Sequence, residues 1–319
     1  MRAVFQLIGL LAFSTCLAMD FTPPKPQEIL HAIGRTDGLP MTLKRALDPG
    51  NDFASLPFPK PGDWLDVHPE AGQSFEDFLR AQRNKPDAVQ NKIYLQPLGE
   101  FPEGQSPPLE TLKQYAVAYF TLDVKILPPL NTSHAKLTTR INPLSRDLQI
   151  LTSDVLMFLK KRLPTDAFCL LAITMEDLYP HPSWNFVFGQ ASLQDRVGVF
   201  SFARYDPAFY GQEREDNYQE VLLRRSCKVL AHEIGHMFSL RHCLYFHCLM
   251  NGSNHLKESD ARPLALCPVC LRKLHTSTGF DVVDRYRNLL YFYRKVGFDR
   301  EARWVSNRYK RILGDERGK

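Results

Sequence analysis

Residues 229–250, VLAHEIGHMFSLRHCLYFHCLM, decide the fold of this chain of 319 residues. His232 and His236 stand four residues apart, so a helix places both imidazoles on one face about one turn from each other. Two imidazoles in this arrangement can hold one zinc ion. Glu233 is rotated off that face, where its carboxylate can reach a water at an open coordination position without binding the metal. The stretch therefore predicts a helix that carries two metal ligands and a general base.

His242 follows His236 by six residues, too far for the same helical face unless the helix ends and the chain reverses. A third imidazole would complete a catalytic zinc site with three protein ligands and one open position. The alternative is an ordinary helix, because two histidines on an amphipathic helix are more often surface or core residues. The third histidine, Met250 and an ordered set of cysteines, all within forty residues, favour the zinc site.

Four cysteines predict a second metal site. Cys243 and Cys248 lie five residues apart, and Cys267 and Cys270 form a CxxC pair, so the two pairs can meet on one tetrahedral zinc whose positions are all filled. Such a site is structural. The alternatives are two disulfides or four unrelated thiols. Because Cys243 directly follows His242, metal binding here would fix the segment that carries the third histidine.

The sequences HEIGHMFSLRHC, CLM and CPVC resemble the archaemetzincin family of zinc metallopeptidases, its vertebrate branch above all. The resemblance is strongest over residues 184–285. It implies a metzincin-like α/β fold with a mixed twisted sheet, packed helices, an active-site helix and a smaller helical C-terminal subdomain stabilised by zinc. It also implies two zinc ions per chain and peptidase or aminopeptidase-like activity. Met250 would form the turn beneath the catalytic zinc, and the alternative for it is an ordinary core methionine.

Ser239 departs from the family pattern, which normally has glycine three residues after the second histidine. Glycine suits this point because the chain must reverse there, commonly through a residue with positive φ. Serine in that conformation costs about 1 kcal/mol or somewhat more. Either the loop tolerates the strain or His242 binds poorly, and we expect tolerance. On this reasoning Ser239→Gly tightens zinc binding by up to roughly tenfold.

The pattern along the chain favours an α/β fold because predicted strands alternate with predicted helices. Residues 21–91 are a proline-rich lead-in, expected to be extended or loosely packed; residues 92–242 are predicted to form the upper catalytic subdomain and 243–319 the lower one. Predicted strands cover 92–99, 124–130 and 166–175, with an antiparallel pair at 184–192 and 196–205, and predicted helices cover 109–121, 150–163, 218–240, 281–298 and 300–314. The antiparallel pair is the candidate edge for holding extended substrate, with ordinary sheet core as the alternative.

Composition limits the partners of the chain. It is 44% hydrophobic and 24% charged with a net charge of +5, which is typical of a globular protein. Its basic clusters are short, and residues 249–266 mix acidic with basic side chains beside the cysteines, so nucleic-acid binding is not expected. We expect a monomer that acts on a peptide or protein substrate.

Residues 1–20, MRAVFQLIGLLAFSTCLAMD, are typical of a secretory signal peptide and too short and interrupted for stable membrane insertion. The predicted thiolate site favours instead an intracellular, cytosolic protein, because thiols stay reduced there. The compartment is therefore left open by the sequence. Loss of Cys16 would leave six cysteines, of which Cys169 and Cys227 are expected to be buried free thiols.

The expected reaction is peptide hydrolysis. Zinc held by His232, His236 and His242 would acidify its water and polarise a peptide carbonyl, while Glu233 takes the water's proton and passes it to the leaving amine. The alternative is a catalytically silent, zinc-stabilised module that binds peptides. Glu233 favours the enzyme, because a scaffold has no need of a base beside the metal.

Overall fold

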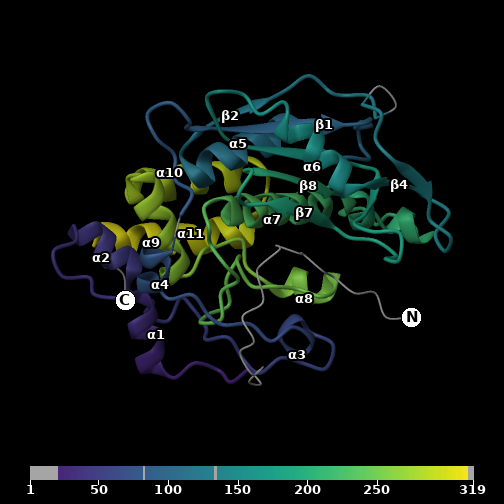
Figure 1. Ribbon diagram of the computed structural model, residues 1–319. Coiled ribbons are helices and arrows are strands. Elements are labelled where there is room, and N and C mark those ends of the chain that lie inside the picture. Colours follow the sequence, from purple (N-terminus) through teal and green to yellow (C-terminus); the bar gives the residue numbers. More distant parts are fainter. Residues whose placement is uncertain (1–20, 82, 133–134, 315–319) are drawn as a thin grey trace. The chain divides into compact units, whose positions relative to one another are not determined.

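The structure is a computed structural model that describes residues 21–81, 83–132 and 135–314. The predicted signal peptide, residues 1–20, lies outside the described residues. Helices and strands follow one another along these residues (Figure 1). The described residues divide into two compact units: one contains Pro86–Val117 and Leu122–Glu233, and the other contains residues 21–85, Ala118–Thr121 and residues 234–314.

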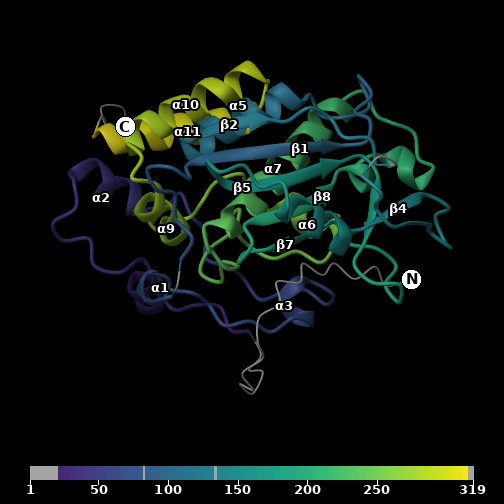
Figure 2. The same cartoon turned by 45° about the horizontal axis from the view of Figure 1, so that its top comes forward.

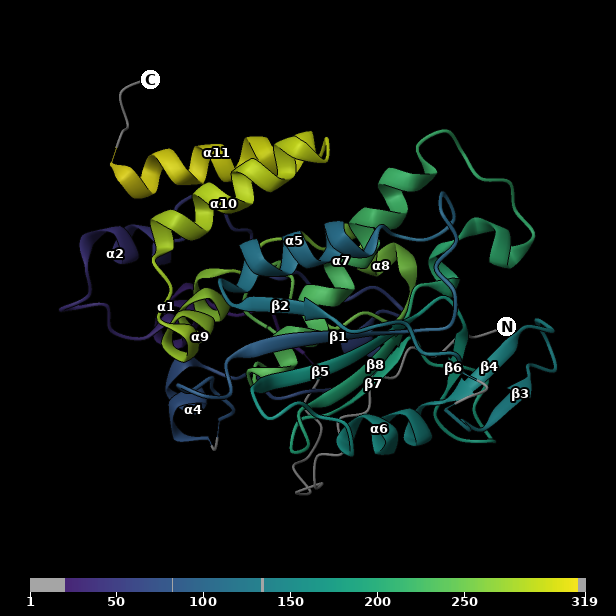
Figure 3. The ribbon, with the colours of Figure 1, turned by 90° about the horizontal axis from the view of Figure 1, so that it is seen from above.

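A five-stranded sheet forms the centre of the first unit, in the order β2-β1-β5-β8-β7 (Figures 2 and 3). Four strands are parallel: β1 (Lys92–Leu98), β2 (Asp123–Ile126), β5 (Ala167–Thr174) and β8 (Val197–Ser201). All eight residues of β5 are buried, as expected for a central parallel strand covered on both faces. β7 (Gly189–Ser192) runs antiparallel to β8 and is the last strand of the sheet, which confirms the predicted antiparallel edge pair.

Helices cover this sheet. α6 (Thr152–Lys160) packs through Val155 and Leu159 on the face that carries Leu170 and Ala172 of β5. α5 (Leu109–Phe120) connects β1 to β2. The helix predicted over 150–163 begins two residues later than expected, because Ile150 and Leu151 belong to strand β4 (Leu148–Leu151) and pair with β6 (Asp177–Tyr179).

A second, three-stranded sheet was not predicted from the sequence. It contains β3 (Thr139–Ile141), β4 (Leu148–Leu151) and β6 (Asp177–Tyr179), in the order β3-β4-β6. The predicted pair 184–192 and 196–205 is longer than the two strands observed, because the first segment enters β7 only at Gly189 and the second ends in the 3₁₀ turn η1 (Ala203–Tyr205). A further turn, η2 (Pro207–Tyr210), follows.

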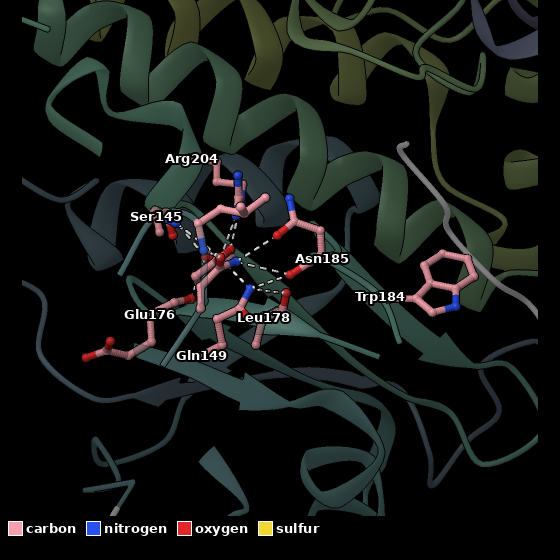
Figure 4. Close-up of polar contacts among 12 residues, drawn as sticks. Ser145, Gln149, Glu176, Leu178, Trp184, Asn185 and Arg204 are labelled. Atoms are coloured by element: carbon pink, nitrogen blue, oxygen red, sulfur yellow. Dashed lines mark hydrogen bonds and ion pairs between the residues drawn. The ribbon is translucent and has the colours of Figure 1, made fainter. Parts of the chain in front are cut away.

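A buried polar network joins this small sheet to the loop before β7 (Figure 4). The Asp177 carboxylate accepts two bonds from the Arg204 guanidinium, at 2.8 and 2.7 Å, and one from the Gln149 amide at 2.7 Å. Gln149 also donates to the carbonyl of Asn185 at 2.9 Å, while the Trp184 ring points away from the network. A buried ion pair is stable only when its remaining polar atoms are bonded. The network therefore holds the segment around Asn185, which leads into the edge strand β7, against the small sheet.

The lead-in forms four short helices in the second unit: α1 (Pro26–Ile33), α2 (Met41–Leu47), α3 (Trp64–Val67) and α4 (Phe75–Arg80). The expectation of an extended or loosely packed segment is wrong. Leu43, Ala46 and Leu47 are buried on one side of α2, and α1, α2 and α4 all contact α9 (Pro268–Thr278). Pro26 begins α1, since proline tolerates the first turn, where no N–H partner is needed.

The C-terminal helices agree with the sequence. α10 (Val282–Lys295) and α11 (Asp299–Leu313) are separated by Gly297, whose φ is +76°. The shorter helix α8 (Leu256–Ala261) precedes them. Arg308 on α11 is fully buried and donates to Asp52 and to backbone carbonyls of the lead-in. Within the described ranges, no helix is long and apolar enough to cross a bilayer.

Candidate metal centres

Helix α7 (Tyr218–Met237) carries the first two predicted ligands and the predicted base. It begins at the residue expected from the sequence and ends three residues earlier than predicted, at Met237. His232 and Glu233 are each 3% exposed, and His236 follows one turn after His232. The helix therefore holds the histidine pair and the carboxylate in a largely buried stretch.

The reversal after α7 is a Schellman turn with serine at its left-handed position. Ser239 has φ +64°, its N–H donates to the carbonyl of His236 at 2.7 Å, and the N–H of Leu240 donates to the carbonyl of Gly235 at 3.3 Å. The positive φ expected at Ser239 is confirmed. The serine hydroxyl also accepts a hydrogen bond from the backbone N–H of Asn84 at 3.1 Å. The side chain is thus used by the turn and not merely tolerated.

His232, His236 and His242 come together, with one ring nitrogen of each within 4.8 Å of the others. The Nδ1 atom of His236 donates to the carbonyl of Leu240 at 2.6 Å, and that of His242 donates to the carboxylate of Glu70 at 2.8 and 3.0 Å. These bonds leave Nε2 of both rings as the nitrogen with a lone pair, which is how metal-binding histidines are normally oriented. Burial lowers the pKa of His236 to about 3, so this ring is neutral at physiological pH. The donor set therefore fits zinc.

Met250 packs directly under the histidine helix. It is fully buried, and a Cβ placed on Gly235 would lie 2.6 Å from its sulfur. The carbonyl of Met250 accepts from the N–H of Cys243 at 2.8 Å. Asn251 braces the same loop by donating to the carbonyls of Cys243 and Phe246 at 2.7 and 2.9 Å. Met250 thus supports the helix with an apolar side chain. Its sulfur lies so close to the helix backbone at residue 235 that only glycine fits there.

The four predicted cysteine ligands form one buried cluster. Their sulfurs lie within 4.8 Å of one another, and those of Cys243 and Cys267 are 3.5 Å apart. A disulfide requires about 2.05 Å, whereas sulfurs bound tetrahedrally to one zinc lie about 3.8 Å apart. All four are free thiols, so the two-disulfide alternative is excluded for them. Burial raises the pKa of the Cys267 thiol well above its usual value, so four thiolates here would need a cation. Cys169 and Cys227 are buried and form no disulfide, as expected.

A third group of potential ligands has a different role. Asp63, His255 and Glu258 approach within 4.8 Å of one another. Both nitrogens of His255 are already used, since Nδ1 accepts from the N–H of Glu258 at 3.2 Å and Nε2 faces the Asp63 carboxylate at 3.2 Å. The Glu258 carboxylate accepts from the N–H groups of Trp64 and Asn254. This group caps α8 and leaves no ring lone pair for a metal.

Two residues at the site were missed by the sequence reasoning. Glu70 contacts His242, and Gln73 bonds both ends of the reversal, donating to the carbonyl of Ser239 at 3.2 Å and accepting from the N–H of Arg241 at 3.1 Å. Both come from the lead-in, more than 160 residues before their partners. No motif or spacing in the sequence marks them.

Comparison with known proteins places the chain in a family. Residues 132–276 match the model of peptidase family M54. Archaemetzincin-2 from Macaca fascicularis is 46% identical over 276 residues, covering 78% of this chain and 77% of the relative. The chain belongs to the archaemetzincin family. Archaemetzincin-2 from Homo sapiens is 45% identical with the same coverage, and the solved archaemetzincin from Methanopyrus kandleri is 28% identical, covering 61% of this chain and 99% of that one with a TM-score of 0.45.

Membership confirms the resemblance inferred from the histidine and cysteine motifs. This archaemetzincin is a zinc metallopeptidase and acts on peptide or protein substrates. Its mixed α/β fold is as predicted.

Proposed function

We propose that this archaemetzincin cleaves peptide bonds at a zinc held by His232, His236 and His242, with Glu233 as general base. We further propose that Cys243, Cys248, Cys267 and Cys270 hold a second, structural zinc that stabilises the helical C-terminal part. The observation that carries the first proposal is the convergence of three imidazoles, two of which have Nδ1 already bonded.

Zinc, when bound, supplies a Lewis acid that polarises the substrate carbonyl and acidifies water. Glu233 is buried and adjacent in sequence to the first ligand, so its carboxylate can take a proton from the attacking water and deliver it to the departing amine. His236 and His242 contribute neutral Nε2 atoms whose direction is set by their Nδ1 partners. Met250 supports the helix from below and binds no metal.

The edge strand β7 is the proposed substrate platform. It pairs with β8 on one side, and no strand pairs with its other side in the described part of the chain. An extended peptide can add to such an edge through backbone hydrogen bonds, which bind many sequences with little selectivity. Aminopeptidase-like activity would need, in addition, an acidic group for the free amine of the substrate. Peptides with free and acetylated N-termini, compared in one assay, distinguish the two specificities.

Loss of Glu233 tests the mechanism and separates the enzyme from a silent peptide-binding module. Glu233→Ala removes the base and no ligand, so peptide turnover should fall by at least about a hundredfold while zinc content and melting temperature stay near wild type. Glu220→Ala, on the exposed first turn of the same helix, is the matched control and should keep full turnover. Equal cleavage by wild type and Glu233→Ala would show that the mechanism is wrong.

The division of the chain at residues 242 and 243 and the cytosolic placement stay predictions. Four zinc-binding thiolates suit a compartment where thiols are reduced. Imaging of the full-length chain with a C-terminal fluorescent tag would test the placement, and a secreted product would contradict it.

A further inference from the structure

Glu70 accepts a hydrogen bond from Nδ1 of the third histidine, His242. Both of its carboxylate oxygens lie within hydrogen-bond distance of His242 Nδ1, at 2.8 and 3.0 Å, and the side chain is only one-quarter exposed. The indole N–H of Trp64 donates to the same carboxylate. The Glu70 carboxylate is therefore a largely covered hydrogen-bond acceptor directly beside His242.

Trp64 fixes the position of this carboxylate. Its backbone N–H donates to Glu258 at 3.0 and 3.1 Å, and its indole covers Gly252 so closely that a Cβ there would overlap the ring. The indole also meets the His242 ring edge-on, with centroids 5.1 Å apart. Glu70 and His242 are thus held against one another by a tryptophan that is anchored through its backbone and its ring.

The three histidines differ in what holds them. His232 and His236 are on one helix, and Nδ1 of His236 donates to the carbonyl of Leu240 in the adjoining turn. His242 lies beyond the helix end, on a loop, where the backbone alone does not set the direction of the ring. A carboxylate on Nδ1 selects the tautomer with the lone pair on Nε2, fixes the ring plane and makes the ring a stronger ligand.

We propose that Glu70, from the lead-in, is a positioning residue of the catalytic zinc site and that it acts through His242. The inference rests on the proposed function, because it takes His242 to be a zinc ligand. It gives the lead-in a role in metal binding: the site is completed by a residue that precedes the histidine motif by more than 160 positions.

The test compares catalytic-site metal affinity in full-length variants. Each protein is titrated with a chelator that removes only the more labile zinc, and the visible spectrum of the Co²⁺-loaded protein is recorded alongside. Loss of a partner of a metal-binding histidine typically weakens metal binding about 10–100-fold. We expect Glu70→Ala to weaken it by that amount and to change the Co²⁺ spectrum. Glu70→Gln keeps an acceptor oxygen and should recover part of the affinity.

Two controls separate positioning from a general effect on folding. Glu76→Gln alters a half-exposed carboxylate on α4, in the same part of the lead-in, and should leave affinity and spectrum unchanged. Loss of zinc from the cysteine site would mean that Glu70→Ala has disturbed the fold. A Glu70→Ala protein that keeps the cysteine-bound zinc and wild-type affinity at the labile site would overturn the inference.

The variant His242→Ala distinguishes a failure of the Glu70 inference from a failure of the proposed zinc site. If His242→Ala leaves labile zinc binding unchanged, His242 is not a ligand and the proposed site itself is wrong. If His242→Ala weakens binding while Glu70→Ala does not, only the role of Glu70 is wrong. In the double variant, loss of Glu70 should add nothing to the loss of His242, because Glu70 acts through that ring. A further loss of metal affinity in the double variant, beyond that of His242→Ala, would show that Glu70 does not act through His242.

Discussion

Ser239 offers two substitutions that separate backbone strain from a hydrogen bond. The residue lies at φ +64°, where a Cβ costs about 1 kcal/mol or more, and its hydroxyl accepts a bond from the N–H of Asn84 at 3.1 Å. Ser239→Ala keeps the Cβ and removes the acceptor. Ser239→Gly removes both. The difference between these two variants therefore measures the strain, and the difference between serine and alanine measures the hydrogen bond.

The magnitudes nearly cancel in the glycine variant. A hydrogen bond of this kind contributes about 0.5–1.5 kcal/mol, so Ser239→Ala should lower the melting temperature by about 1–2 °C for a chain of 319 residues. Ser239→Gly loses the same bond and is relieved of about 1 kcal/mol of strain, so its melting temperature should stay within about 1 °C of wild type. The tenfold tightening of zinc binding expected from the sequence alone shrinks for the same reason to about threefold or less.

The assay is thermal unfolding of the zinc-loaded proteins, combined with a chelator titration at one pH. Equal melting temperatures for the alanine and glycine variants would show that Ser239 is not strained. A large gain in zinc affinity for Ser239→Gly would show instead that His242 is hardly bound in the natural sequence.

Two further substitutions test the packing around the site. Gly235→Ala should lower the melting temperature, because the new Cβ would lie 2.6 Å from the Met250 sulfur and overpacking typically costs about 1–3 kcal/mol. Alanine is about 1 kcal/mol more favourable than glycine in a helix, so a higher melting temperature would show that Met250 does not pack against the helix at this point. Arg308→Met should destabilise the protein by at least about 1–3 kcal/mol, because three backbone carbonyls of the lead-in lose their buried donor, although Asp52 keeps Arg311 at 2.9 Å. Arg303→Met, on the exposed side of α11, should change little, and similar melting temperatures for both variants would refute the bridge between the lead-in and α11.

The parts of the site that the sequence predicts are those set by local spacing. The helix with its two histidines, the reversal at Ser239 and the buried strand β5 all follow from periodicity and turn geometry over a few residues. The cysteine cluster follows from paired spacing, although the spacing alone could not distinguish zinc from disulfides.

The parts that the sequence does not predict depend on contacts between distant segments. Nothing near Glu70 or Gln73 indicates that they meet the loop after α7. The small sheet β3-β4-β6 was missed because its strands are three or four residues long, and its buried Asp177 becomes favourable only when Arg204 and Gln149 surround it. The prolines of the lead-in predict an extended or loosely packed segment, whereas Pro26 begins a helix.

Zinc-edge X-ray absorption of the wild type and of His236→Ala, with zinc content measured on the same samples, tests the central claim most directly. Separate donor sets of histidines and cysteines predict two zinc ions per chain in the wild type, with nitrogen or oxygen neighbours at about 2.0–2.1 Å and sulfur neighbours at about 2.3 Å. His236→Ala should keep one zinc with sulfur neighbours alone and an intact fold. A single zinc in metal-replete wild type, or sulfur neighbours lost together with His236, would contradict the account.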